Sequence, residues 1–197
     1  MKKNFFIVIF LIFIFANKSF SYSTDPKQFI SEIVEEAKQI LVASNSKEYK
    51  TKKLSEMALQ TVDIKGVGFY SLGKYRKNLN DDQLKEYLSL FEKYFLKSFT
   101  SRLTDYSDPK INVISVEVIN PKYTIVKSIL LATSKRPEVK IEWRVYTKNP
   151  DKPLIRDLII EGLSLARTQK EEFSSVIESN NGDVTKLFST LKEFIKK

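Results

Sequence analysis

The sequence has no histidine and no cysteine among its 197 residues. Without histidine, the chain lacks the side chain that most often exchanges protons near neutral pH, and a frequent metal ligand. Without cysteine, it can form no disulfide, no thiol nucleophile and no cysteine-linked lipid anchor, and the usual zinc ligands are missing. Because only carboxylates, lysine, tyrosine and serine remain for catalysis, the composition favours a binding protein over an enzyme, with no metal and no cofactor.

Internal repeats, low-complexity tracts and long linkers are also absent from the sequence. Hydrophobic residues make up 42% of the chain and charged residues 29%, which is typical of a globular protein. A chain of this length can bury a substantial core. We therefore predict a single domain over residues 22–197.

No hydrophobic run is long enough to span a bilayer comfortably, since a transmembrane helix needs roughly 20 apolar residues. The longest run, residues 5–16, follows two lysines and ends shortly before the small residues Ser19 and Ser21. This order of basic start, apolar run and small-residue cleavage site is typical of a secretory signal peptide. We interpret residues 1–21 as a cleaved signal, with an uncleaved membrane anchor as the alternative.

Basic residues outnumber acidic ones by 33 to 24, which gives a formal charge of +9. Removal of residues 1–21 would delete three lysines and no acidic residue, and so lower the charge by three, from +9 to +6. Such an excess favours anionic lipid surfaces, acidic protein partners or nucleic acid. For an exported protein, nucleic acid is the least favoured of these, and we expect none to bind.

Apolar residues recur every three or four positions in several segments, which predicts α-helices. Two of these segments carry clear start signals. Asp25 followed by proline is typical of a helix N-cap, and Asn80 with Gln83 three residues later has the form of a capping box. The predicted helices cover residues 26–45, 47–60, 81–103, 167–179 and 184–196.

Between Lys110 and Glu161 the hydrophobic period changes to two, in stretches rich in valine and isoleucine. Short turns separate these stretches, so we predict an antiparallel meander with one apolar face. Helices, then strands, then helices indicate an α+β fold whose sheet can curl around a cavity. The predicted strands cover residues 111–119, 123–133, 138–147 and 154–161.

The sequence offers few groups for chemistry. Asp157 and Arg144 both lie in predicted strands, where they can form a structural ion pair across the sheet. Perturbed carboxylates also cluster at active sites, so Asp157 is the first candidate for a catalytic group. Gly66-Val67-Gly68 lacks the third glycine and the strand-to-helix context of a nucleotide-binding loop, and we interpret these glycines as turn or close-packing residues.

Two segments resemble the MlaC family. Val-Asp-Ile at residues 62–64, Gly-Phe-Tyr-Ser-Leu-Gly-Lys-Tyr at residues 68–75 and Gln83 are similar to the family's Asp-centred motif, its Leu-Gly-Arg-Tyr-Trp-Arg stretch and its Gln-containing helix start. Asp-Leu-Ile-Ile-Glu-Gly-Leu-Ser-Leu at residues 157–165 resembles the strongest family signature, Asp-Val-x-Ile-Glu-Gly-Val-Ser-Leu. The chain departs from the family at Arg76, where a tryptophan is usual, and at Lys170, where an arginine is usual.

This resemblance implies an NTF2-like α+β fold, in which a twisted antiparallel sheet of about four strands is wrapped by helices around an apolar pocket. It further implies a periplasmic carrier that shuttles phospholipid between the outer and inner membranes and maintains outer-membrane lipid asymmetry. The implied partners are phospholipid, an inner-membrane ABC transporter with an MCE-domain subunit, and an outer-membrane lipoprotein complex. We expect the carrier itself to be a monomer.

The candidate pocket lining combines the inward face of the sheet with the helices that face it, although apolar stripes also form ordinary core. Two other hypotheses remain open: an NTF2-like hydrolase or isomerase that uses a pocket carboxylate such as Asp157, and a basic adaptor with a solid core. A cavity below roughly 300 Å³ would favour the adaptor. The candidate lipid-binding residues are Phe69, Leu72, Phe91, Phe95, Val126, Ile129, Trp143, Val145, Ile160, Leu163 and Phe173.

Overall fold

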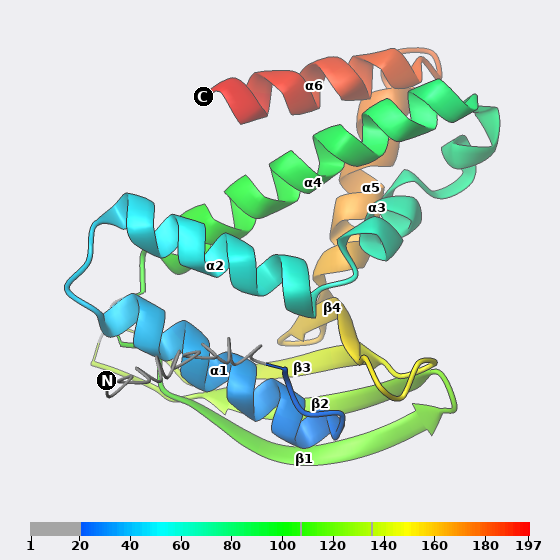
Figure 1. The fold of residues 1–197 in the computed structure, drawn as a ribbon. Coiled ribbons are helices and arrows are strands. Elements are labelled where there is room, and N and C mark those ends of the chain that lie inside the picture. Colours follow the sequence, from blue (N-terminus) through cyan, green and yellow to red (C-terminus); the bar gives the residue numbers. More distant parts are fainter. Residues whose placement is uncertain (1–20, 107, 135) are drawn as a thin grey trace, which may run out of the picture.

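The computed structural model describes residues 21–106, 108–134 and 136–197, so the predicted signal peptide lies outside the described residues apart from its last position. Within these ranges, six α-helices lie above a five-stranded sheet (Figure 1). The helices are α1 (Pro26–Val42), α2 (Lys47–Thr61), α3 (Ile64–Leu72), α4 (Asp81–Leu103), α5 (Leu165–Glu178) and α6 (Val184–Lys196), with a short 3-10 helix η1 (Gly73–Asn78) after α3. The strands are β1 (Ile111–Asn120), β2 (Tyr123–Leu130), β3 (Val139–Tyr146), β4 (Leu154–Ile160) and β5 (Leu163–Ser164).

The sheet is the predicted antiparallel meander, in the order β1-β2-β3-β4-β5. Its register places Val126 of β2 opposite Trp143 of β3, so these side chains share the face that lies against α1. Strand β2 is three residues shorter than predicted, because the chain turns back where Thr133 and Arg136 pair as an isolated bridge. The two-residue strand β5 was not predicted; it pairs with the end of β4 across a tight turn.

The helix start signals are confirmed. The carboxylate of Asp25 accepts a hydrogen bond from the backbone N–H of Gln28, and Asn80 and Gln83 form both bonds of the capping box. Helix α1 ends three residues before the predicted position, because the chain must be extended where Ser46 caps α2. Helix α5 begins two residues earlier than predicted, because Ser164 acts as its N-cap.

Helix α3 was not predicted, since Gly66 and Gly68 were interpreted as turn or close-packing glycines. The turn interpretation is wrong: Asp63 caps the segment, and both glycines lie inside the helix. The close-packing interpretation is confirmed at Gly68, where an added Cβ would lie 2.8 Å from the ring of Phe91. The hydroxyl of Tyr87 donates to the Gly68 carbonyl at 2.9 Å, and its burial raises the pKa of this phenol.

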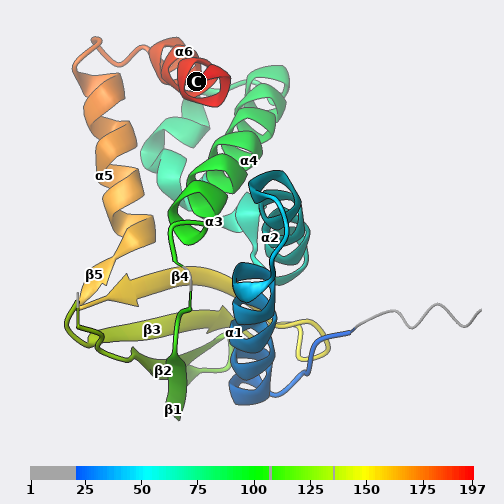
Figure 2. The same ribbon diagram turned by 90° about the vertical axis from the view of Figure 1, so that its left-hand side faces the viewer.

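Buried apolar side chains form two clusters instead of one. The helical cluster joins α3, α4, α5 and α6, and the sheet cluster joins α1 and α2 to the inner face of the sheet. Figure 2 shows the corresponding arrangement, with α1 lying along the sheet and α4, α5 and α6 above it. Helix α4 contributes to both clusters: Phe91 and Phe95 belong to the helical side, and Phe99 and Leu103 to the sheet side.

Candidate functional site

The junction between the two clusters is built on α4. Phe95 packs against the helical cluster and Phe99 against the sheet cluster, and their rings stack in parallel with centroids 5.9 Å apart. Trp143 packs against the sheet cluster from β3, and its indole N–H donates to the Ser128 hydroxyl at 2.8 Å. Phe95, Phe99 and Trp143 are each only partly buried. These three large apolar side chains, which we call the junction residues, are therefore not sealed within either cluster.

The structure divides most of the predicted lining residues between the two clusters. Val126 and Val145 lie in the sheet cluster with Trp143 beside them, on the inner face of the sheet. The predicted lining residues that lie in the helical cluster are Leu72, Phe91 and Phe173, and Phe95 packs against this cluster. The two groups meet at the junction residues, because the Phe95 ring stacks on Phe99 of the sheet cluster.

The remaining predicted residues belong to neither cluster. Ile129 pairs with Lys140 and so lies on the opposite face of the sheet from Val126, because side chains alternate along a strand. Leu163 is 59% exposed. Phe69 lies partly exposed on α3, with the cations of Lys65 and Arg76 over its ring. Ile160 is partly buried and pairs with Ile141, so it lies on the same face of the sheet as Trp143 and Val145, as predicted.

Sequence reasoning left two contributions to this region out of the candidate set. Phe99 falls within a predicted helix, but it is not among the candidate lipid-binding residues. Helix α1 covers the inner face of the sheet with Phe29, Ile30 and Ile33, all at most 4% exposed. The helical spacing of these residues is the signal that marks the covering face, but a spacing alone does not say which element it covers.

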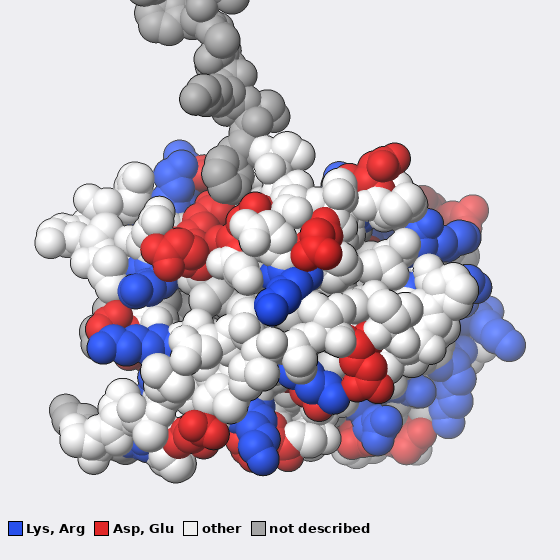
Figure 3. All heavy atoms as spheres, turned by 90° about the horizontal axis from the view of Figure 1, so that it is seen from below, with Lys and Arg blue, Asp and Glu red and all other residues white. Residues whose placement is uncertain are grey.

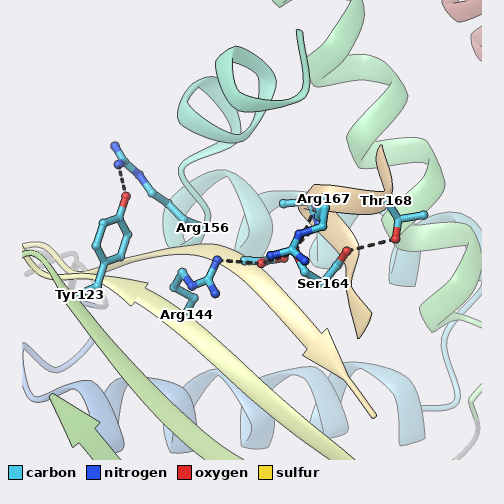
Figure 4. A network of polar contacts seen from close by, with 8 residues as sticks. Tyr123, Arg144, Arg156, Ser164, Arg167 and Thr168 are labelled. Atoms are coloured by element: carbon cyan, nitrogen blue, oxygen red, sulfur yellow. Dashed lines mark hydrogen bonds and ion pairs between the residues drawn. The ribbon is translucent and has the colours of Figure 1, made fainter. Parts of the chain in front are cut away.

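Asp157 is buried and forms a polar network with Arg144, Ser164 and Ala166, of which Arg144 and Ser164 are labelled in Figure 4. One carboxylate oxygen accepts from Arg144 at 3.1 Å and from the Ser164 hydroxyl at 2.7 Å, and the other accepts from the backbone N–H of Ala166 at 3.0 Å. The side chain of Asp157 is only 2% exposed, whereas that of Arg144 is 41% exposed. The predicted ion pair between Arg144 and Asp157 is thus confirmed, and Asp157 fixes the first turn of α5, where the helix dipole favours a negative charge.

The turn between β4 and β5 also depends on local residues. Glu161 and Gly162 both have a positive φ, of 48° and 83°, as a tight two-residue hairpin turn requires. Glycine adopts this conformation without strain, while glutamate does so less readily. The Glu161 carboxylate accepts from the backbone N–H of Lys140 at 2.5 Å, which fastens the turn to β3. The segment 157–165 therefore builds the corner that leads from the sheet into α5.

A second polar network connects the helices to the sheet. Arg156 donates to Asp63, which also caps α3, with nitrogen-to-oxygen distances of 2.7 and 2.6 Å. The same guanidinium donates to the Tyr123 hydroxyl at 2.9 Å (Figure 4) and lies 3.4 Å from the ring centroid of Tyr146. Burial opposes the charge of Arg156, but the bonds to Tyr123 and Asp63 outweigh it and raise the pKa of the guanidinium.

The family model described as MlaC protein matches residues 27–193. The chain belongs to the MlaC family. A solved structure described as the phospholipid-binding protein from Ralstonia solanacearum in complex with a phospholipid has the same fold, with a TM-score of 0.70. The sequences are 19% identical, over 85% of this chain and 94% of that one. The predicted family and the predicted α+β fold are confirmed.

The MlaC signatures of this chain have structural roles. Asp63 caps α3 and binds Arg156, Tyr75 donates to Glu178 of α5 at 2.8 Å, and Asp157 organises the start of α5. In place of the usual tryptophan, Arg76 lies with its guanidinium carbon 5.2 Å from the ring centroid of Phe69. The motifs that resemble the family thus position the helices around the junction residues.

This MlaC chain also has a polar groove beside α5, with a volume of about 530 Å³. Its lining mixes both signs of charge with hydroxyl groups, so it is not the apolar pocket that the resemblance implied. In the part of the chain that the structure describes, no cluster of acidic residues could hold a metal ion, and no helix is long and apolar enough to cross a membrane. The groove is lined by Tyr70, Arg167, Lys170, Glu171, Ser174, Ser175, Glu178 and Ser179.

Proposed function

We propose that this protein is a phospholipid carrier that acts in the periplasm between the inner and outer membranes. The observation that carries the proposal is the match of the MlaC family model over residues 27–193. The fold shared with a protein described as binding a phospholipid supports the same cargo. The signal-like segment at residues 1–21 supports export.

The physical need for a carrier follows from the size of the cargo. The two tails of a phospholipid contain on the order of 30 methylenes, and at about 0.8 kcal/mol each their exposure to water would cost on the order of 20 kcal/mol. A protein interior that replaces the bilayer makes the transfer nearly isoenergetic. The carrier then needs no chemistry of its own, and direction comes from its partners at the membranes.

We place the tails at the junction between the helical cluster and the sheet cluster. Phe95, Phe99 and Trp143 pack against the two clusters but remain partly exposed there. A tail inserted between them would bury the exposed parts of these rings. The phosphate would stay at the surface, because burial of an unpaired charge is expensive.

The expected partners are an inner-membrane ABC transporter with an MCE-domain subunit and an outer-membrane lipoprotein complex. The enzyme hypothesis is less well supported, because both Asp157 oxygens already accept hydrogen bonds. In addition, the register pairs Asp157 with Arg144, on the opposite face of β3 from Trp143 and Val145. A buried carboxylate on that face that already accepts three hydrogen bonds is poorly placed to act on a ligand at the junction.

The test uses native mass spectrometry of the protein after purification and after mixing with phospholipid vesicles. We expect a mass increase equal to bound phospholipid, and Phe99→Gln should reduce the lipid-bound fraction. Val42→Gln is the matched control, since Val42 is 50% exposed on α1. A bare polypeptide mass under all conditions would contradict the proposal.

The single tryptophan provides an independent readout. Because Trp143 is partly exposed at the junction, lipid that enters there should shift its fluorescence emission to shorter wavelength. Lipid binding with unchanged Trp143 emission would retain the carrier function but would place the tails elsewhere.

A further inference from the structure

Strand β1 lies at the open edge of the sheet, and in the described residues no strand pairs with its outer side (Figure 1). An edge strand presents a row of unpaired backbone N–H and C=O groups, and natural proteins usually blunt it with charge, proline or short length. Strand β1 is ten residues long and contains no proline and one charged residue, Glu117. That charge is engaged within the sheet, where it accepts from Lys127 at 2.7 Å.

The same strand carries the densest set of exposed aliphatic side chains in the described chain. Val116 is 39% exposed and Val118 is 73% exposed, the highest value among the large apolar residues that the structure describes. Ile114 and Ile119, both 51% exposed, occupy the two register shifts of the β1–β2 pairing. Seen from the side on which the sheet lies, wide uncharged areas separate scattered charges of both signs (Figure 3).

An added strand would satisfy both features at once. It would pair with the free backbone groups of β1 and would cover the aliphatic side chains beside it. A lipid surface would cover the side chains only, and would leave backbone donors and acceptors in an apolar environment without partners. The regular stretch between the two register shifts, residues 115–118, is the part of the edge that can accept such a strand.

The charges that flank β1 indicate what kind of strand can pair with its outer edge. Lys110 precedes the strand and Lys122 follows it, each six residues from Val116, and both are exposed. In an antiparallel pair of two copies along residues 115–118, the N-terminal end of each β1 would lie beside the C-terminal end of the other, which brings Lys110 of one copy near Lys122, in the turn after β1, of the other. Like charges placed opposite each other are destabilising, so a second copy fits this register poorly.

We propose that the outer edge of β1 is a docking site for an extended segment of another protein, with an apolar β-forming centre and acidic residues at both ends. The aliphatic centre of that segment lies along residues 115–118, and its acidic ends lie near Lys110 and Lys122. This site is separate from the junction residues, so docking and lipid binding can be tested independently.

The test uses two fluorescein-labelled peptides with the same centre, one acidic (Asp-Glu-Thr-Val-Thr-Val-Thr-Val-Glu-Asp) and one with lysine in place of each acidic residue. We expect the acidic peptide to bind and to slow amide hydrogen exchange over residues 115–118. Val118→Asn should weaken its binding about tenfold, because the polar side chain removes apolar contact at the edge. Leu59→Asn is the matched control, since Leu59 is 50% exposed on α2, and it should leave binding unchanged.

The preference for acidic ends is tested separately with Lys122→Glu, which should weaken binding of the acidic peptide and strengthen binding of the lysine peptide. Lys52→Glu, an equal change of charge at an exposed position of α2, should do neither. Thermal unfolding of each variant shows whether it is folded, and native mass spectrometry shows whether it still carries lipid. A loss of lipid carriage can therefore be distinguished from a loss of peptide binding.

Three outcomes would overturn the proposal. Equal binding of both peptides would remove the argument from charge. Protection from exchange outside β1 would move the site elsewhere. The third is a failure of the acidic peptide to bind while the edge binds something else. Dimers in sedimentation that depend on Val118 would then assign the edge to a second copy. Binding to phosphatidylglycerol vesicles that depends on Val118 would assign it to a lipid surface.

Discussion

Replacement of Asp157 by alanine should destabilise the protein strongly without acting on lipid directly. The buried N–H of Ala166 would lose its acceptor, which costs about 1–3 kcal/mol for an unsatisfied donor. The Ser164 hydroxyl would lose one partner, although it still accepts from the N–H of Arg167. The pair with Arg144 contributes only about 0–1 kcal/mol, because the Arg144 side chain is 41% exposed and water can replace its partner.

We therefore expect Asp157→Ala to lower the free energy of unfolding by about 3 kcal/mol, which corresponds to a fall in Tm on the order of 10 °C for a domain of this size. Asp157→Asn should cost less, about 1 kcal/mol, because its amide oxygen can still accept from Ala166. Urea denaturation followed by circular dichroism measures both values. Lipid content per folded molecule should remain unchanged in Asp157→Asn.

Two results would refute this reasoning. If Asp157→Ala were as stable as the parent protein, the network around α5 would not support the fold. If Asp157→Asn kept full stability but lost a measured hydrolase or isomerase activity, the carboxylate would act chemically and the enzyme hypothesis would be revived.

Three further predictions concern packing, geometry and pH. Gly68→Ala places a methyl group 2.8 Å from the Phe91 ring, so unfolding experiments should show a loss of about 1–3 kcal/mol from overpacking. Arg156→Lys keeps the charge but cannot reproduce the contacts that the guanidinium makes with both the Asp63 carboxylate and the Tyr123 phenol. A double-mutant cycle with Asp63→Asn should therefore give a smaller coupling energy with Asp63 for the lysine variant than for Arg156. Hydrogen bonds from Tyr75 and Lys74 lower the pKa of Glu178, so the folded carboxylate binds its proton less tightly than the unfolded one. Its stabilising effect is present above the ordinary carboxyl pKa and is lost as pH falls through the lower folded value. Glu178→Gln should therefore lower Tm at pH 7 and match the parent at the acid end of the titration.

Elements with local signals could be predicted from the sequence. The N-caps at Asp25 and Asn80, and the alternation along β3, depend on residues close together in the chain, and the structure confirms them. Helix α3 was missed because two glycines lower its helix propensity, although Asp63 supplies a local cap. Its packing against Phe91 is tertiary and leaves no periodic pattern in the sequence.

The candidate site was harder to predict than the fold. Val126 and Ile129 were placed on one face, but three positions apart in a strand they must point to opposite faces. The division of apolar residues into two clusters could not be seen, because periodicity shows which side of an element is buried and not which neighbour buries it. Phe69 illustrates the same limit, since its apolar character gave no sign of the two cations over its ring.

The position of α4 also governs how the molecule unfolds. One end of this helix is packed into the helical cluster through Phe91, and the other into the sheet cluster through Phe99 and Leu103. Because loosening of either cluster removes part of the packing around this one helix, we expect the two halves to unfold in one cooperative transition. Amides in the middle of α4 should then exchange with solvent only when the whole molecule opens.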